Sequence, residues 1–93
     1  MVYAYARLTI TNRDALDSYR EKAAEALARH GGKIEATAAA FTVLDGAPDA
    51  PDVAALLSFP DKASAVAWAE DPDLTELHTL RRSSGASDIL LLG

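Results

Sequence analysis

The stretch from Val2 to Ile10, which reads VYAYARLTI, alternates between two kinds of side chain. Its even positions are aliphatic, whereas its odd positions carry Tyr3, Tyr5, Arg7 and Thr9. A period of two predicts a β-strand with two different faces. The aliphatic face suits a position beneath helices. The aromatic face is unusual for a surface that is left to water.

The residues that follow the first strand change to a helical period. An apolar stripe runs from Leu16 to His30 in steps of three and four, which predicts a helix over residues 13–30. Asn12 is a suitable N-cap because its side-chain oxygen can accept a free backbone N–H. Gly31 and Gly32 can end the helix because glycine takes the left-handed conformation at little cost.

The rest of the chain continues to alternate between strand and helix patterns. A second strand region is expected over 33–45, with a bend or bulge near 38–40 and a β pattern that resumes at Phe41–Leu44. A turn follows over 45–52, rich in Asp, Gly and Pro. Further elements are expected as a strand over 53–59, a helix over 62–70 capped by Asp61, a helix over 72–82 started by Asp71 and Pro72, and a strand over 89–92.

This order predicts one α+β domain over residues 1–93 with the ferredoxin-like βαββαβ arrangement. Right-handed crossovers interleave the four strands as an antiparallel sheet of order 4-1-3-2 with helices on one face. The other face is then uncovered and carries Tyr3 and Tyr5. Because uncovered apolar surface of this kind usually has a partner, we expect a homodimer that forms through this face.

Composition excludes several classes of function. The chain has 93 residues, a formal net charge of -5 and no cysteine. Its acidity disfavours binding to nucleic acid or anionic lipid, and it has no thiolate for a metal site. No apolar run approaches the length that spans a membrane. We expect a cytoplasmic protein without a metal or organic cofactor and without a nucleic-acid or membrane partner.

Three side chains are candidates for a ligand site. His78 and Arg81 share one turn of the last helix, where Arg81 could bind a carboxylate or enolate and His78 could move a proton. Tyr19 could present its hydroxyl to a cavity. The structural alternatives are that Arg81 pairs with Asp14 or Asp17, and that Tyr19 is a core residue.

His30 is interpreted differently from these three residues. It ends the first helix, where a histidine can bond a free carbonyl, and a role as a general base is the alternative. The expected topology puts His30 and Arg81 at opposite edges of the sheet, so we do not expect them to share a site.

An ordered set of short motifs resembles the family known as domain of unknown function 1330. The pieces include Tyr19-Arg20, His30-Gly31-Gly32, Val43-Leu44-Asp45-Gly46, Phe59-Pro60 leading into Ala65-Val66-Ala67-Trp68, Asp71-Pro72, an arginine at the position of Arg81, and the closing Leu91-Leu92-Gly93. The resemblance implies a dimeric α/β barrel, in which two sheets pack face to face. It also implies a superfamily that includes cofactor-free monooxygenases, lactone isomerases, haem enzymes and ligand-binding regulators, among which the fold does not choose.

Two hypotheses of function follow. The first is a homodimer that binds a small organic molecule, or acts on it without a cofactor as a monooxygenase or isomerase would, in a pocket between helices and sheet. The second is a non-catalytic binding or structural module whose function is dimerisation. The first predicts an apolar pocket in which Tyr19, His78 and Arg81 converge, and the second predicts a filled core.

Overall fold

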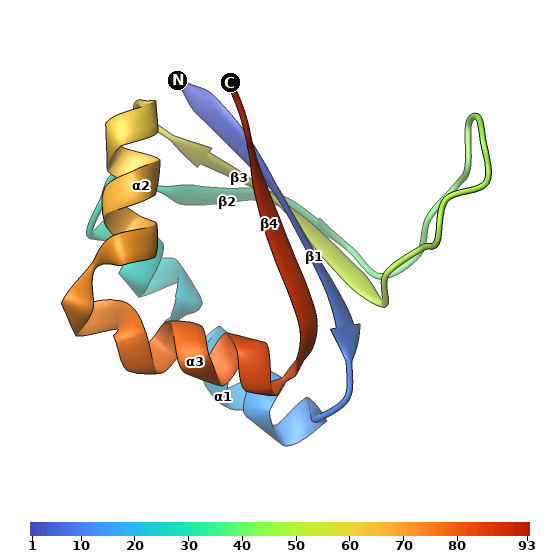
Figure 1. The fold of residues 1–93 in the computed structure, drawn as a ribbon, viewed down its shortest axis with the longest axis horizontal. Coiled ribbons are helices and arrows are strands. Elements are labelled where there is room, and N and C mark those ends of the chain that lie inside the picture. Colours follow the sequence, from blue (N-terminus) through green and yellow to red (C-terminus); the bar gives the residue numbers. More distant parts are fainter.

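The computed structural model describes residues 1–93 and has one four-stranded antiparallel sheet. Its strands are β1 (Val2–Ile10), β2 (Lys33–Ala38), β3 (Val53–Phe59) and β4 (Gly85–Leu92). The strand order is β2-β3-β1-β4, which is the predicted order 4-1-3-2. All the helices cover one face of this sheet, and the two chain ends lie side by side on β1 and β4 (Figure 1). The predicted ferredoxin-like α+β fold is confirmed.

The alternation in β1 separates the two faces of the sheet as expected. Ala4 and Leu8 are buried beneath the helices, while Tyr3 and Tyr5 are exposed on the opposite face. Tyr5 lies between Leu56 of β3 and Leu90 of β4 in the strand register. We call this opposite side the open face of the sheet; its exposed apolar residues are Tyr3, Tyr5, Leu56, Leu90 and Leu92.

The long helix α1 (Arg13–Ala28) begins and ends where local chemistry requires it. The backbone N–H of Ala15 donates to Oδ1 of Asn12 over 3.1 Å, which satisfies one free donor of the first turn. The helix ends two residues before His30, and Gly31 then adopts a φ of 71°, which lets the chain turn back toward β2.

The second half of the chain contains two helices in series. Helix α2 (Lys62–Glu70) is capped by Asp61, and a short 3-10 helix η1 (Pro72–Leu74) leads into α3 (Thr75–Ser83). Asp71 caps η1, since its Oδ1 accepts from the backbone N–H of Asp73 over 2.9 Å. Both helix starts agree with the sequence interpretation.

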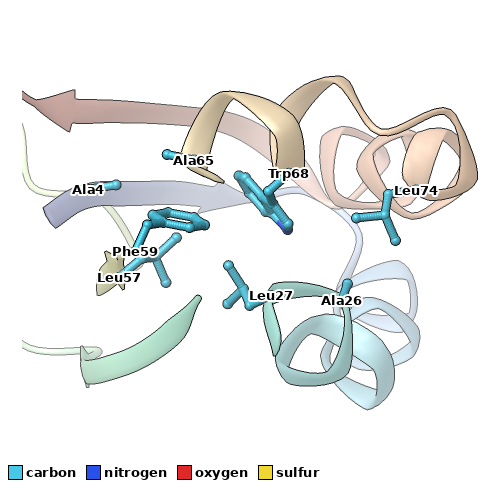
Figure 2. Packing of buried hydrophobic residues seen from close by; sticks show 8 residues of the cluster. All are labelled: Ala4, Ala26, Leu27, Leu57, Phe59, Ala65, Trp68 and Leu74. Atoms are coloured by element: carbon cyan, nitrogen blue, oxygen red, sulfur yellow. The ribbon is translucent and has the colours of Figure 1, made fainter. Parts of the chain in front are cut away.

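The hydrophobic core lies between the helices and the middle of the sheet (Figure 2). The rings of Phe59 and Trp68 pack with their centroids 5.7 Å apart, and Leu27 of α1 lies below them in the close view. Figure 2 shows the eight residues of this cluster: Ala4, Ala26, Leu27, Leu57, Phe59, Ala65, Trp68 and Leu74. None of the helices is long and apolar enough to cross a bilayer.

The bend expected near residues 38–40 is confirmed, since the chain bends at Ala39 and Ala40, just after β2 ends. The register between β2 and β3 also shifts at Glu35, which was not expected. Two details of the strand prediction are wrong. Phe41–Leu44 form no strand, because no strand of this chain lies beside them. Residues 39–52 instead form a long loop that extends away from the sheet (Figure 1). Leu44 in this loop is 94% exposed. Strand β4 begins at Gly85, four residues early, because Gly85 and Ala86 pair with the end of β1.

Candidate functional site

A cavity of about 420 Å³ lies between α1 and the helix-covered face of the sheet. Fifteen of its twenty lining residues are hydrophobic, and seven of them are alanines contributed by β1, α1, β3 and the end of β2. Alanine side chains are too short to fill the space between a helix and a sheet at normal packing density. The alanine content of the chain therefore leaves a hollow beside the core instead of a filled layer.

The polar residues of the cavity are basic or neutral. They are Arg7, Arg20, Thr37, Arg81 and Ser87, and the lining includes no carboxylate. The guanidinium of Arg7 donates to the backbone carbonyl of Asp49 over 3.2 Å. In a protein with a net charge of -5, a cavity with arginines and without acids favours an anion over a cation.

Arg81 is the most constrained of these arginines. Its Cζ lies 5.5 Å from the centroid of the Trp68 ring and 5.8 Å from that of Tyr19, so that the guanidinium is held against two aromatic side chains. Its Nε is buried without a hydrogen-bond partner. No carboxylate lies within ion-pair distance, and the alternative pairing with Asp14 or Asp17 is absent.

Tyr19 and His78 differ in how they meet the cavity. Tyr19 is half-buried on the cavity wall, beside the guanidinium of Arg81. His78 does not line the cavity: its side chain is buried behind Arg81, with only 3% of the residue exposed. The structure thus places Tyr19 and Arg81 at the cavity and His78 one layer beneath it.

Both ring nitrogens of His78 are engaged. One contact of 2.9 Å joins Nε2 to the backbone carbonyl of Trp68, and one of 2.7 Å joins Nδ1 to Nη1 of Arg81. The ring also meets the Trp68 indole edge to face, at 4.8 Å between centroids. Burial lowers the pKa of His78 below its ordinary value, and the positive charges of Arg81 and Arg82 act in the same direction.

His30 lies outside the cavity, as expected from the topology. Its Nε2 is 2.8 Å from Oδ2 of Asp71, so the imidazole bonds a carboxylate and not the free helix carbonyl that the sequence interpretation assigned to it. This hydrogen bond, together with that from the N–H of Asp73, lowers the pKa of Asp71. Nearby, Arg29 pairs with Asp73 over 3.2 Å.

Sequence reasoning missed Arg20 as a lining residue. It follows Tyr19 on α1 and reaches the cavity from the edge of the apolar stripe, at a position that a helical pattern alone assigns to solvent. The structure contains no group of three or more His, Cys, Asp or Glu side chains that could hold a metal ion.

Comparison with known proteins identifies a family and a set of structural neighbours. The model of the family DUF1330, a domain of unknown function, matches residues 1–93. No curated protein matches the chain significantly.

Three solved structures have similar folds. A protein of unknown function from Rhodopseudomonas palustris is 18% identical with a TM-score of 0.77, and the match covers 98% of this chain and 79% of that one. A mutant of SnoaB, a cofactor-independent oxygenase from Streptomyces nogalater, is 18% identical with a TM-score of 0.69. That match covers 99% of this chain and 90% of SnoaB. A dimeric ferredoxin-like protein of unknown function from Jannaschia sp. CCS1 is 18% identical with a TM-score of 0.66 and coverages of 99% and 97%. At these identities the likeness establishes the fold alone.

Proposed function

The chain belongs to the DUF1330 family, whose function is unknown, and we propose that it is a homodimeric protein that binds a small apolar organic anion between α1 and the sheet. One observation carries the ligand part of this proposal. The guanidinium of Arg81 borders an apolar cavity, and it has no carboxylate partner in its own chain.

An unpaired, partly buried guanidinium is costly, because it loses hydration without gaining a counter-charge. A carboxylate or enolate that entered the cavity would supply that charge, and the planar guanidinium can bond both oxygens of a carboxylate at once. The mostly apolar walls favour a ligand with a hydrocarbon or aromatic body, and the volume is in the range of small-molecule sites. Tyr19 would contact the ligand beside Arg81, and His78 would act through Arg81.

The proposal is one of binding, although SnoaB, a fold neighbour, is a cofactor-independent oxygenase. A reaction that removes a proton from the ligand needs a base at the cavity. The lining includes no histidine, aspartate, glutamate, lysine or cysteine, and both nitrogens of His78 are occupied. Turnover of the ligand would therefore have to rely on the ligand's own acidity or on Tyr19.

The dimer part of the proposal rests on the open face of the sheet. Tyr5 is 38% exposed and its neighbour Leu90 is 65% exposed in the single chain, and both would be covered if two sheets packed face to face. The ferredoxin-like neighbour from Jannaschia is dimeric, which supports a dimer for this chain as well. A module that only dimerises is the alternative, but it gives no reason for an apolar cavity bordered by an unpaired arginine.

Calorimetric titration with a matched pair of probes tests the ligand proposal. The acid 2-naphthoate and the neutral 2-naphthamide share the same aromatic body and differ in charge. We expect the wild type to bind the acid at least about tenfold more tightly than the amide, which is the usual contribution of a hydrogen bond to a charged group. Arg81→Met should remove that preference while the protein remains folded.

Arg82→Met is the control, because Arg82 is the next residue on α3 and is exposed outside the cavity. It should leave the preference for the acid unchanged. Equal affinity of the wild type for both probes, or an unchanged preference in Arg81→Met, would contradict the proposed site.

A further inference from the structure

The position of His78 is explained by a backbone carbonyl that α2 leaves free. In an α-helix the carbonyl of Trp68 would accept from the N–H of the residue four positions later. That residue is Pro72, which has no N–H. Nε2 of His78 takes the place of the missing donor over 2.9 Å.

These contacts determine which nitrogen of His78 carries the proton. A carbonyl oxygen can only accept, so Nε2 must donate to Trp68. A guanidinium can only donate, so Nδ1 must accept from Nη1 of Arg81. One neutral tautomer satisfies both contacts, and it fixes the direction of the Arg81 side chain against the rings of Trp68 and Tyr19.

We propose that His78 is a pH-sensitive positioning residue, which holds Arg81 at the cavity when neutral and releases it, and with it the bound anion, when protonated. This inference rests on the proposed function. A protonated imidazole has no lone pair for Arg81, and it would place a second positive charge 2.7 Å from the guanidinium. Arg81 would then have to leave its position against the rings of Trp68 and Tyr19.

The charged groups around His78 act mostly against its protonation. On its own helix it faces Arg81 and Arg82, and both disfavour a further positive charge. From the junction of α2 and η1 it faces Asp71, which favours the charged form but is already bonded to His30. From α1 Tyr19 lies beside Arg81, with its ring centroid 5.8 Å from Cζ. Burial and the two arginines therefore oppose the protonation of His78, so the contact between His78 and Arg81 breaks only in acid.

The test uses naphthalene-2-sulfonate, which stays ionised at acidic pH, and the neutral naphthalene-2-sulfonamide of the same shape. Affinities are measured by calorimetry from about pH 8 to about pH 4.5, a range that spans histidine titration, with circular dichroism as the check on folding. We expect wild-type affinity for the sulfonate to fall at least about tenfold across this range, since a hydrogen-bonded charge contact is lost. Affinity for the sulfonamide should stay constant.

Two substitutions of His78 separate positioning from mere packing. His78→Gln keeps a donor for Trp68 and an acceptor for Arg81 but does not titrate, so it should bind the sulfonate as the wild type does near pH 8 and keep that affinity on acidification. His78→Leu should lower the affinity for the sulfonate about tenfold at every pH, which is the usual contribution of a charged hydrogen bond. The affinity for the sulfonamide should not change. His30→Gln removes the only other histidine and should retain the wild-type pH response.

Several results would overturn the inference. The inference is wrong if the wild-type affinity for the sulfonate stays constant or rises on acidification. It is also wrong if the affinity of His78→Gln responds to pH as that of the wild type does. In both cases the proposed anion site would stand. A loss of affinity for both probes in His78→Leu would assign His78 a packing role only. Failure of the sulfonate to bind at any pH would overturn the inference and the proposed function together.

Discussion

His30 and Asp71 lie 2.8 Å apart, between Nε2 and Oδ2, and this contact joins the end of α1 to the start of η1. The same carboxylate accepts from the N–H of Asp73 with its other oxygen. One side chain thus caps η1 and fixes two helices to each other.

Asp71→Asn is expected to lower the melting temperature at neutral pH. The variant should then lose less stability than the wild type when the pH is lowered. The folded protein holds the pKa of Asp71 below 3.8, so this carboxylate stabilises the fold above that pH, and its contribution is lost as the pH falls through the folded pKa. Thermal melts across acidic pH measure both effects. Asp73→Asn is the control, because Asp73 pairs with Arg29 through an exposed contact and should change the melts little. Equal profiles for the two variants would contradict this role.

The stability of the wild type is also expected to decline as the pH falls below 6.5. His78 has its pKa lowered in the folded protein, so the unfolded chain takes up the proton first and unfolding becomes more favourable in acid. Well above 6.5 the residue is neutral in both states and its contribution does not change. Urea titrations over this range should show a smaller decline in His78→Gln. An identical decline would mean that other groups account for the acid sensitivity.

Tyr5→Asp is expected to convert the proposed dimer to a monomer. The substitution would bury an unpaired charge between two sheets, which should cost several kcal/mol of dimer stability. Light scattering at micromolar concentration should give twice the chain mass for the wild type and the single mass for the variant. Val66→Asp is the control, because Val66 is 41% exposed on α2, away from the open face. A monomeric wild type, or a Tyr5→Asp variant that stays dimeric, would exclude this interface.

Gly85→Ala is expected to destabilise the fold by about 3 kcal/mol or more, as an overpacked position does. A Cβ at Gly85 would lie 1.8 Å from the carbonyl oxygen of Thr9, so the start of β4 could not stay paired with β1. Gly46→Ala, in the exposed loop after β2, meets no atom within 4 Å and should cost about 1 kcal/mol through its positive φ alone. Similar melting temperatures for the two variants would contradict the close approach at Gly85.

The fold could be predicted because its signals are local. The alternation from Val2 to Ile10, the N-caps at Asn12 and Asp61, and the Asp71-Pro72 start each depend on neighbouring residues, and the structure confirms them. Phe41–Leu44 misled the prediction because a β pattern needs a strand beside it, and none lies there in this chain.

The site was predictable only in part. Arg81 and Tyr19 stood out by residue type and helix position, and both border the cavity. The environment of His78 depends on residues distant in sequence. Pro72 has no N–H to donate to the carbonyl of Trp68, and the fold places this free carbonyl beside the imidazole of His78. The pairing of His30 with Asp71 joins residues that are 41 positions apart, which no periodicity reveals.

The most direct test of the anion site is a crystal structure of the protein with 2-naphthoate. We expect the carboxylate to lie within hydrogen-bond distance of the Arg81 guanidinium and beside the Tyr19 ring, with the naphthyl group among the alanines between α1 and the sheet. A cavity that stays closed to the probe, or a probe bound only elsewhere with Arg81 turned to solvent, would contradict this expectation.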